Sequence, residues 1–419
     1  MLMTPNYKRT KLTCYAAYFT MSSIFILPPL LFATLQDTYG ISYTLLGTLV
    51  LTNFCTQMLV DLLFSLFAKK FNEKLLVRVT PLITSLGLVI YALVPTLLPQ
   101  FAYAGLLAGT IIFSIAAGLS EVMLSPTIAA LPSDNPQRDM SMLHSLYAFG
   151  VVTMVLFSTA FLKIFDNESW NILVIILALF PVIPSVLFSG APMPELTISG
   201  EKKSVGRAGK RAVGIMLCMA CIFFGSSAEN AMSNWISGYT EVALGVDKIV
   251  GDVLGTMMFA ALLGLARISY AKFGKNIIRV LLVGMAGAVV CYLTAGLSPN
   301  VTVAFIACMV MGFTTSMLWP GTLIMMEEKI PDAGVTAFAL MAAGGDLGAA
   351  VSPQLLGVIV DKVSASSLGT ELALKLGLSA EQVGLKAGMI VSALFPMAGF
   401  ITVLVIIRFF KKNDLSENK

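Results

Sequence analysis

Residues 118–152 have the sequence GLSEVMLSPTIAALPSDNPQRDMSMLHSLYAFGVV. This stretch comprises an apolar helix with one carboxylate, Glu121, then a polar loop over residues 132–139, and a second apolar helix with His144, the only histidine of the chain. A charged side chain in the hydrocarbon layer costs about 3 kcal/mol on insertion scales, so it faces other protein or a water-filled cavity. We therefore expect Glu121 to be a functional residue. The alternative is a structural acid that is hydrogen-bonded to a neighbouring helix.

The composition is typical of a protein with many membrane-spanning helices. Hydrophobic residues make up 57% of the chain and charged residues only 12%, whereas a soluble protein has about 25% charged residues. Nothing in the sequence resembles a nucleic-acid-binding surface, a phosphate-binding loop or a nucleophilic triad. We therefore predict no enzymatic activity, no cofactor and no nucleic-acid partner. The six cysteines all lie in apolar segments, and we expect them to pack as small hydrophobic residues rather than to bind a metal.

Apolar segments long enough to cross a lipid bilayer recur along the whole chain. A spanning helix needs about 20 residues. The segments that meet this requirement are residues 12–34, 43–68, 75–97, 101–129, 140–163, 169–188, 212–240, 249–271, 277–298, 301–326, 335–360 and 386–410. We therefore predict an all-α membrane protein with twelve transmembrane helices.

The distribution of positive charge supports this count. If both termini are cytoplasmic, only five of the 27 lysines and arginines lie in outside loops, and Arg267 lies within a helix. The others lie on inside segments, and an excess of Lys and Arg in cytoplasmic loops sets the orientation of membrane proteins. We therefore predict cytoplasmic termini. The compact loops favour a bacterial inner membrane over a eukaryotic membrane.

A polar and basic segment, SGAPMPELTISGEKKSVGRAGKR, divides the twelve predicted helices into two groups of six. Because it is rich in Gly and Pro, it predicts a linker. We therefore predict an N-terminal six-helix bundle over residues 1–188, a cytoplasmic linker over 189–211 and a C-terminal six-helix bundle over 212–419. In the last outside loop, residues 361–386, we expect a short surface helix over residues 379–386.

An internal repeat relates the two predicted bundles. Residues 311–348 match the first stretch at one constant offset without gaps. The matched pairs are Gly118 with Gly312, Met123 with Met317, Leu124 with Leu318, Pro126 with Pro320, Leu146 with Leu340, and Gly150 with Gly344. Equivalent features at equivalent points of two six-helix halves predict a duplicated transporter with a binding site near the membrane midplane.

Several motifs also resemble a known family. They are Glu121-x-x-x-Ser125-Pro126, the run DMSMLHSLYAFG over residues 139–150, Gly312-x-x-x-Ser316-x-x-x-Pro320, residues 344–361 with Pro353 and Gly357, and Glu229 with Trp235 and Tyr239. Over its whole length the chain resembles the major facilitator superfamily. Within it, the chain is similar to the fucose-permease-like sugar:proton symporters.

The resemblance implies a major facilitator fold, with two pseudo-symmetric six-helix bundles. It also implies a proton-coupling role for Glu121, which falls on the glutamate of the family's fourth-helix motif, with Ser125 in place of the usual Asn. The sequence departs from the family in its first helix, where Ile24 occupies the position of an acid four residues before Pro28.

Further proton-coupling candidates are Glu229 and His144. In the family, the first, fourth, seventh and tenth helices line the central cavity, so the resemblance implies that Glu121 and Glu229 face each other from the two halves. An unperturbed histidine titrates near pH 6.5, which suits a proton relay. The alternative for His144 is a hydrogen-bonding or capping residue at a helix entrance.

Candidate substrate-binding residues are Asn53, Gln57, Ser125, Trp235 and Trp319. Asn53 and Gln57 are four residues apart and share a helix face, so they can bind either substrate hydroxyls or a neighbouring helix. The two tryptophans can stack on the apolar face of a sugar ring. The alternative for each tryptophan is packing or anchoring at the membrane interface.

Three other charged residues are candidates for a cytoplasmic gate: Asp61, Arg267 and Asp346. We expect Arg267 to pair with Asp346 on a neighbouring helix. Breaking a buried ion pair costs several kcal/mol, because the remaining charge has no partner, so such a pair can act as a gate. The alternative is a static structural pair.

Together these observations predict a secondary transporter that works by alternating access. The first hypothesis is proton-coupled uptake of a sugar or similar small polar solute by a monomer in the lipid bilayer, driven by a gradient of protons or of another ion. The second is proton-coupled export of drugs or amphipathic compounds, which the missing first-helix acid and the 23 methionines favour. The third is a non-transporting membrane receptor with the same fold.

Overall fold

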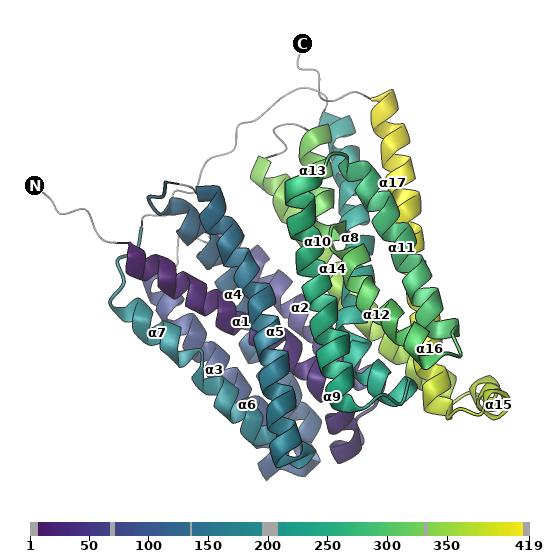
Figure 1. Ribbon diagram of the computed structural model, residues 1–419. Helices are drawn as coiled ribbons and strands as arrows, with labels where there is room; N and C mark the ends of the chain where they lie inside the picture. Colours follow the sequence, from purple (N-terminus) through teal and green to yellow (C-terminus); the bar gives the residue numbers. More distant parts are fainter. Residues whose placement is uncertain (1–6, 68–71, 135, 195–207, 331–333, 414–419) are drawn as a thin grey trace, which may run out of the picture. The chain divides into compact units, whose positions relative to one another are not determined.

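A computed structural model describes residues 7–67, 72–134, 136–194, 208–330 and 334–413 (Figure 1). All regular secondary structure within these ranges is helical. The prediction of an all-α fold is therefore confirmed.

The first six predicted spans correspond to seven helices. These are α1 (Lys8–Tyr39), α2 (Tyr43–Phe67), α3 (Glu73–Leu97), α4 (Ala102–Ala130), α5 (Pro136–Phe165), α6 (Trp170–Leu179) and α7 (Val182–Ser189). The sixth span is divided into α6 and α7 at Phe180 and Pro181. A proline within a helix removes a backbone hydrogen bond, so the interruption at Pro181 has a local cause.

The last six predicted spans are interrupted more often. The seventh comprises α8 (Ala208–Gly238) and the π-helix η4 (Tyr239–Ala243), and the eighth comprises α9 (Lys248–Val250), the π-helix η5 (Gly251–Met257) and α10 (Met258–Phe273). The others are α11 (Ile277–Leu297), α12 (Val301–Thr315) with α13 (Leu318–Lys329), α14 (Gly334–Ser364), and α16 (Ala380–Ser392) with α17 (Leu394–Lys412).

Among the described residues, eleven helical segments are long and apolar enough to cross a membrane. The remaining predicted span corresponds to α5, whose apolar part Phe149–Phe165 is shorter. The twelve predicted segments therefore each have a helical counterpart.

The two halves pack their helices in the same way. The first helix of each half packs against the fifth (α1 with α5, and α8 with α14), and the third packs against the fourth (α3 with α4, and α11 with α12). The third helix also begins alike in both halves. The Asn72 side chain accepts a hydrogen bond from the Leu75 N–H, and the Asn276 side chain accepts one from the Arg279 N–H. These common features agree with the internal repeat.

The chain forms two compact units, which we describe separately. Unit 1 comprises residues 1–41 and 52–199, and unit 2 comprises residues 42–51 and 200–419. The beginning of α2 belongs to unit 2 because the Asp361 carboxylate on α14 accepts hydrogen bonds from the Tyr43 N–H (3.2 Å) and the Thr44 N–H (2.7 Å). The Tyr43 hydroxyl also donates to Glu381 (2.7 Å). The predicted linker lies mostly outside the described residues.

The short helix expected within residues 361–386 lies earlier than predicted. It is α15 (Ser367–Leu376), which begins at a Ser366 cap and ends at Gly377 in the left-handed conformation. Residues 380–386, which belonged to the predicted surface helix, form the beginning of α16 instead. Ser379 and Gln382 form a capping box there, and the helix continues into the last span.

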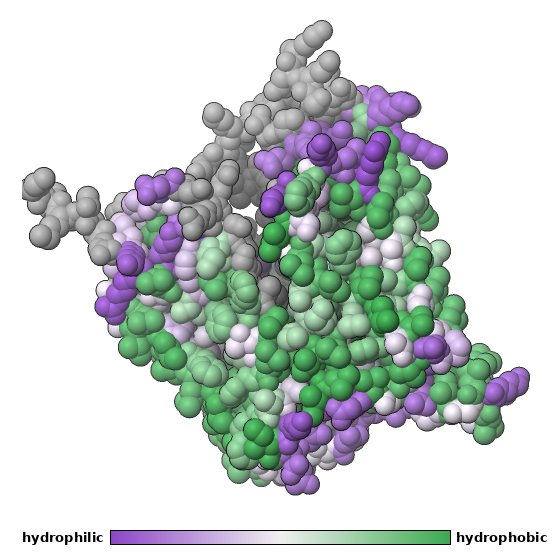
Figure 2. Space-filling view, viewed as in Figure 1, coloured by the Kyte–Doolittle hydropathy of each residue, from purple (hydrophilic) through white to green (hydrophobic). Residues whose placement is uncertain are grey.

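The outer surface of unit 2 is suited to lipid. Val283, Val290 and Leu297 recur every seven residues along α11 and are exposed, which makes one apolar stripe along the helix. Figure 2 shows hydrophobic residues over the middle of the visible face of unit 2 and hydrophilic residues at its two ends. This distribution matches a hydrocarbon layer between two aqueous interfaces.

Candidate functional site

In unit 1, α2 and α4 cross closely at Gly118. A Cβ atom at Gly118 would lie 3.0 Å from the Val60 Cβ and 3.2 Å from the Gln57 carbonyl oxygen. A larger residue would keep the helices apart. This crossing positions Asp61, the residue after Val60, beside Glu121, which lies one turn beyond Gly118.

Asp61 and Glu121 form a pair of like charges. Both residues lie at this close crossing of α2 and α4, and two carboxylates at one site repel each other when both are ionised. The Oδ1 atom of Asp61 is buried and has no hydrogen-bond partner within the described residues, whereas the Glu121 side chain is exposed. Asp61 was predicted to belong to a gate and Glu121 to a proton site, and the structure places both at one helix crossing.

Asn53 and Gln57 are buried at the same helix crossing, with 8% and 3% of their surface exposed. The Gln57 Nε2 donates to the Asn53 Oδ1 (3.0 Å), and the Ser114 hydroxyl on α4 donates to the same oxygen (2.6 Å). These side chains therefore hold α2 against α4 in this conformation, which is the alternative that the sequence analysis left open.

The remaining residues of interest in unit 1 are Ser125, His144 and Ile24. Ser125 is half-buried on α4, one turn after Glu121. His144 lies on α5, but its side chain is outside the described residues, as is that of Ile24 on α1. The proton-relay role of His144 stays a prediction.

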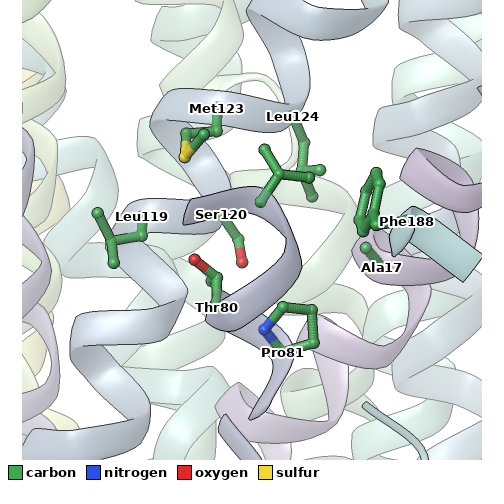
Figure 3. Close-up of a pocket in the computed structure, with 9 residues that line it drawn as sticks. Ala17, Thr80, Pro81, Leu119, Ser120, Met123, Leu124 and Phe188 are labelled. Atoms are coloured by element: carbon green, nitrogen blue, oxygen red, sulfur yellow. The ribbon is translucent and has the colours of Figure 1, made fainter. Parts of the chain in front are cut away.

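A small cavity lies beside this site, between α1, α3, α4 and α7 (Figure 3). Its volume is about 10 Å³, which is close to the minimum for a single water molecule. Figure 3 shows the hydroxyl groups of Thr80 and Ser120 close to each other at this cavity. The cavity is too small for a sugar, so it is not a substrate site in this conformation.

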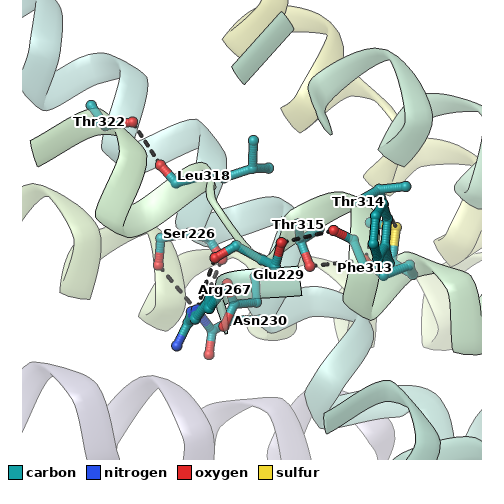
Figure 4. A network of polar contacts seen from close by, with 11 residues as sticks. Ser226, Glu229, Asn230, Arg267, Phe313, Thr314, Thr315, Leu318 and Thr322 are labelled. Carbon is teal, nitrogen blue, oxygen red and sulfur yellow. Dashed lines mark hydrogen bonds and ion pairs between the residues drawn. The ribbon is translucent and has the colours of Figure 1, made fainter. Parts of the chain in front are cut away.

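In unit 2, Glu229 on α8 and Arg267 on α10 form an ion pair (Figure 4). The Arg267 Nη2 lies 3.6 Å from the Glu229 Oε2. The Arg267 Nε also donates to the Ser316 carbonyl oxygen (2.9 Å). The side chains of Arg267 and Glu229 are 40% and 20% exposed.

Asp346 was the predicted partner of Arg267, and the charged side chain that the structure shows beside Arg267 is Glu229. The helix of Arg267 packs against α12, whereas α14, the helix of Asp346, packs against α8 and α16. Asp346 is half-buried on α14, and its role in a gate stays a prediction.

Polar residues continue along α8 on both sides of Glu229. Asn230 Nδ2 donates to the Ser226 carbonyl oxygen (3.1 Å) and hydroxyl (3.2 Å), and Asn234 Nδ2 donates to the Asn230 carbonyl oxygen (2.9 Å). Figure 4 shows Ser226 and Asn230 next to Glu229 and Arg267. Neither asparagine was among the predicted site residues, although residues 226, 230 and 234 have the spacing of one helix face.

The two candidate tryptophans differ in their surroundings. Trp235 is 1% exposed, its indole N–H donates to the Pro353 carbonyl oxygen (3.1 Å), and its ring lies 5.4 Å from that of Tyr43. In this conformation Trp235 is therefore packed against Tyr43 and Pro353, and neither face of its ring is open to a substrate. Trp319 is half-buried, and its ring lies so close to Gly345 that a Cβ atom there would overlap with it.

No group of three His, Cys, Asp or Glu side chains among the described residues has the arrangement of a metal site. Cys218 and Cys221 are both buried, and the Cys221 sulfur contacts the Thr322 hydroxyl at 3.6 Å.

Comparisons with known proteins agree with this architecture. The family model of the Major Facilitator Superfamily matches residues 13–353. No curated protein matches the chain in a sequence search.

Several solved structures share the fold. A bacterial homologue of the human lysosomal transporter Spinster, in an inward-facing and unoccupied conformation, has a TM-score of 0.78 and 15% identity, with 98% of this chain and 99% of that chain covered. A D-xylose–proton symporter has a TM-score of 0.75 and 15% identity, with 93% and 97% covered. The Escherichia coli fucose:proton symporter has a TM-score of 0.60 and 12% identity, with 96% and 99% covered. Structures of a nucleoside transporter and a peptide transporter are similar as well.

The family match covers most of the chain, and the helical bundles with their repeated packing account for it structurally. The protein belongs to the Major Facilitator Superfamily and is a multi-pass membrane transporter.

Proposed function

We propose that this transporter couples the uptake of a sugar or similar small polar solute to the movement of a proton, by alternating access. The observation that carries the proposal is the pair of Asp61 and Glu121, in which a buried carboxylate oxygen of Asp61 has no hydrogen-bond partner. Two carboxylates at one site repel each other when both are ionised, so a shared proton stabilises the pair.

Coupling requires that this proton be held in one conformation and released in another. A movement that separates α2 from α4, or that admits water to Asp61, removes the reason for sharing the proton. Glu121 is exposed and is the member of the pair that can exchange the proton with water. Glu229 and His144 are further candidates for proton transfer.

A polar solute is supported by the polar face of α8. The amide of Asn230 is half-buried beside Glu229, and amide groups bind substrate hydroxyls. Ser226 and Asn234 are buried and hydrogen-bond with Asn230, so they hold this residue in place. The similarity to a D-xylose–proton symporter and a fucose:proton symporter points in the same direction. We further propose that the protein is a monomer in a bacterial inner membrane, with both termini cytoplasmic.

One observation favours a second candidate, the export of amphipathic compounds by proton antiport. Ile24 stands where the resembling sugar symporters have an acid in the first helix. Without this acid, one hydrogen-bonding group for a sugar is missing, and an apolar surface suits an amphipathic molecule better.

The test is solid-supported membrane electrophysiology on purified protein in liposomes, with a panel of sugars under an imposed pH gradient. We expect a current that depends on both solute and protons, and that disappears in Glu121→Gln. Asp37→Asn, an exposed carboxylate near the end of α1, is the matched control and should behave like the wild type. Proton-driven uptake that persists in Glu121→Gln would contradict the coupling role.

A further inference from the structure

The guanidinium group of Arg267 is only partly used by the protein. Arginine has five N–H donors, and in the described structure only Nε makes a hydrogen bond, to the Ser316 carbonyl oxygen. The 3.6 Å distance from Nη2 to Glu229 is too long for a hydrogen bond. With 40% of its side chain exposed, Arg267 has donors available to a third group.

The pair with Glu229 does not have the geometry of a purely structural salt bridge. Removing two charges from water is compensated only when the pair is close and its remaining atoms are hydrogen-bonded. Here the Glu229 Oε2 is buried and has no hydrogen-bond partner within the described residues. The contact is therefore loose on both sides, although the Nε hydrogen bond fixes the orientation of the guanidinium plane.

The chemistry of a guanidinium group indicates what completes this site. Its planar fork binds carboxylates and phosphates through two parallel hydrogen bonds. An exposed arginine inside a membrane-spanning helix must face protein or water, not lipid. Asn230, which is half-buried on α8, lies next to it (Figure 4) and can bind a hydroxyl group of the same ligand.

Glu229 limits the charge of that ligand. Its carboxylate lies beside the same guanidinium, so every negative charge on a bound group is repelled by it. A singly charged carboxylate suffers less repulsion than a doubly charged phosphate. The site therefore favours a monocarboxylate with hydroxyl groups.

We propose that Arg267 binds a carboxylate of the transported solute, so that the substrate is a hydroxylated monocarboxylate of the sugar-acid class rather than a neutral sugar. This inference rests on the proposed uptake of a small polar solute and specifies its chemical class. Glu229 competes with the substrate carboxylate for Arg267, and Asn230 on α8 binds a hydroxyl group of the substrate.

Matched ligands test this directly. D-Glucose and D-glucuronate, and D-galactose and D-galacturonate, differ only in a hydroxymethyl or carboxylate group, and glucose 6-phosphate supplies a doubly charged ligand. Their affinities would be measured by isothermal titration calorimetry on purified protein, with transport currents recorded in parallel. We expect the wild type to bind the uronates and to bind the neutral sugars and the phosphate at least tenfold more weakly.

Three substitutions examine the residues. Arg267→Gln should weaken uronate binding by about 10- to 100-fold, the range for loss of charge-assisted hydrogen bonds. Arg267→Lys keeps the positive charge but loses the planar guanidinium group, so its affinity for uronates should lie between those of the wild type and Arg267→Gln. Glu229→Gln removes the competing anion and should bind uronates at least as tightly as the wild type. Lys272→Gln, an exposed cation on the same helix, is the control and should leave the affinity unchanged.

The outcomes separate this inference from the proposed function. Proton-coupled uptake of neutral sugars with unchanged activity in Arg267→Gln would overturn the inference and leave the function intact. Arg267-dependent binding of uronates without any proton-dependent current would support the inference and contradict proton coupling. Absence of uronate binding to the wild type, or preferential binding of glucose 6-phosphate, would overturn the inference. The selectivity of the wild type decides this even if a variant does not fold.

Discussion

Asp61 with Glu121 and Glu229 with Arg267 are two charge pairs of opposite character. The first holds two acids in unit 1, and the second holds an acid and a base in unit 2. A pair of acids is stabilised by binding a proton, and an acid–base pair is neutral without one. On our proposals the two halves therefore have different roles. The Asp61–Glu121 pair of unit 1 exchanges the proton, and Arg267 of the unit 2 pair binds the anionic group of the solute.

Asp139, at the beginning of α5, allows a prediction about pH at the scale of single residues. The hydrogen bond from Lys11 on α1, followed by that from the Ser133 hydroxyl, holds the pKa of this carboxyl below its ordinary value. A group with a depressed pKa stabilises the folded state above its unfolded pKa, about 3.9, and loses this effect as the pH falls through the folded value.

We therefore expect Asp139→Asn to lower the unfolding temperature by a few degrees at pH 7, because partly exposed ion pairs contribute little. The difference from the wild type should disappear as the pH falls below about 4. Scanning fluorimetry in detergent across this pH range measures it. Asp134→Asn, which replaces an exposed carboxylate just before α5, is the control. An equal loss of stability in both variants would contradict the role of the Lys11 contact.

At the scale of helices, the repeated glycines mark close crossings. Gly118 and Gly312 occupy equivalent positions in the two halves. A Cβ atom at Gly312 would overlap with the Phe259 carbonyl oxygen of α10, which is backbone and cannot move aside, whereas one at Gly118 would meet the Val60 side chain at 3.0 Å. The second contact can relax more easily.

We predict that Gly312→Ala destabilises the protein by about 1–3 kcal/mol, the range for overpacking, and that Gly118→Ala costs less. Gly264 on α10 is the matched control, because a Cβ atom there would have no neighbour within 4 Å. Gly264→Ala should be neutral or stabilising by up to about 1 kcal/mol through helix propensity. Chemical denaturation of the three variants in detergent tests this order, and a Gly312→Ala variant as stable as Gly264→Ala would contradict it.

The same crossings explain which part of the site the sequence could predict. Span positions follow from apolar length alone, so the twelve segments and the repeat could be identified without a structure. The partner of a side chain depends on how each helix is rotated and which helices pack together. That is why Asp346 was named for Arg267 instead of Glu229, and why the Asp61–Glu121 pair and the polar face of Asn230 and Asn234 were missed.

At the scale of the whole molecule, the placement of positive charge fixes a prediction about orientation. Reversing the protein would expose most of its 27 lysines and arginines to the outside, against the bias that sets topology. An odd number of spans would place the two termini on opposite sides. A reporter on the C-terminus and another in an outside loop therefore test the helix count and the orientation together.

We expect green fluorescent protein fused after Lys419 to fluoresce in the cytoplasm of a bacterial host, and alkaline phosphatase fused there to be inactive. Alkaline phosphatase inserted after Gly377, between α15 and α16, should be active, because its disulfides form only in an oxidising compartment. Active phosphatase after Lys419 together with inactive phosphatase after Gly377 would show that the protein has the opposite orientation. Phosphatase activity at both positions would exclude an intact final span between them, and with it the twelve-helix arrangement on which the two equivalent halves depend.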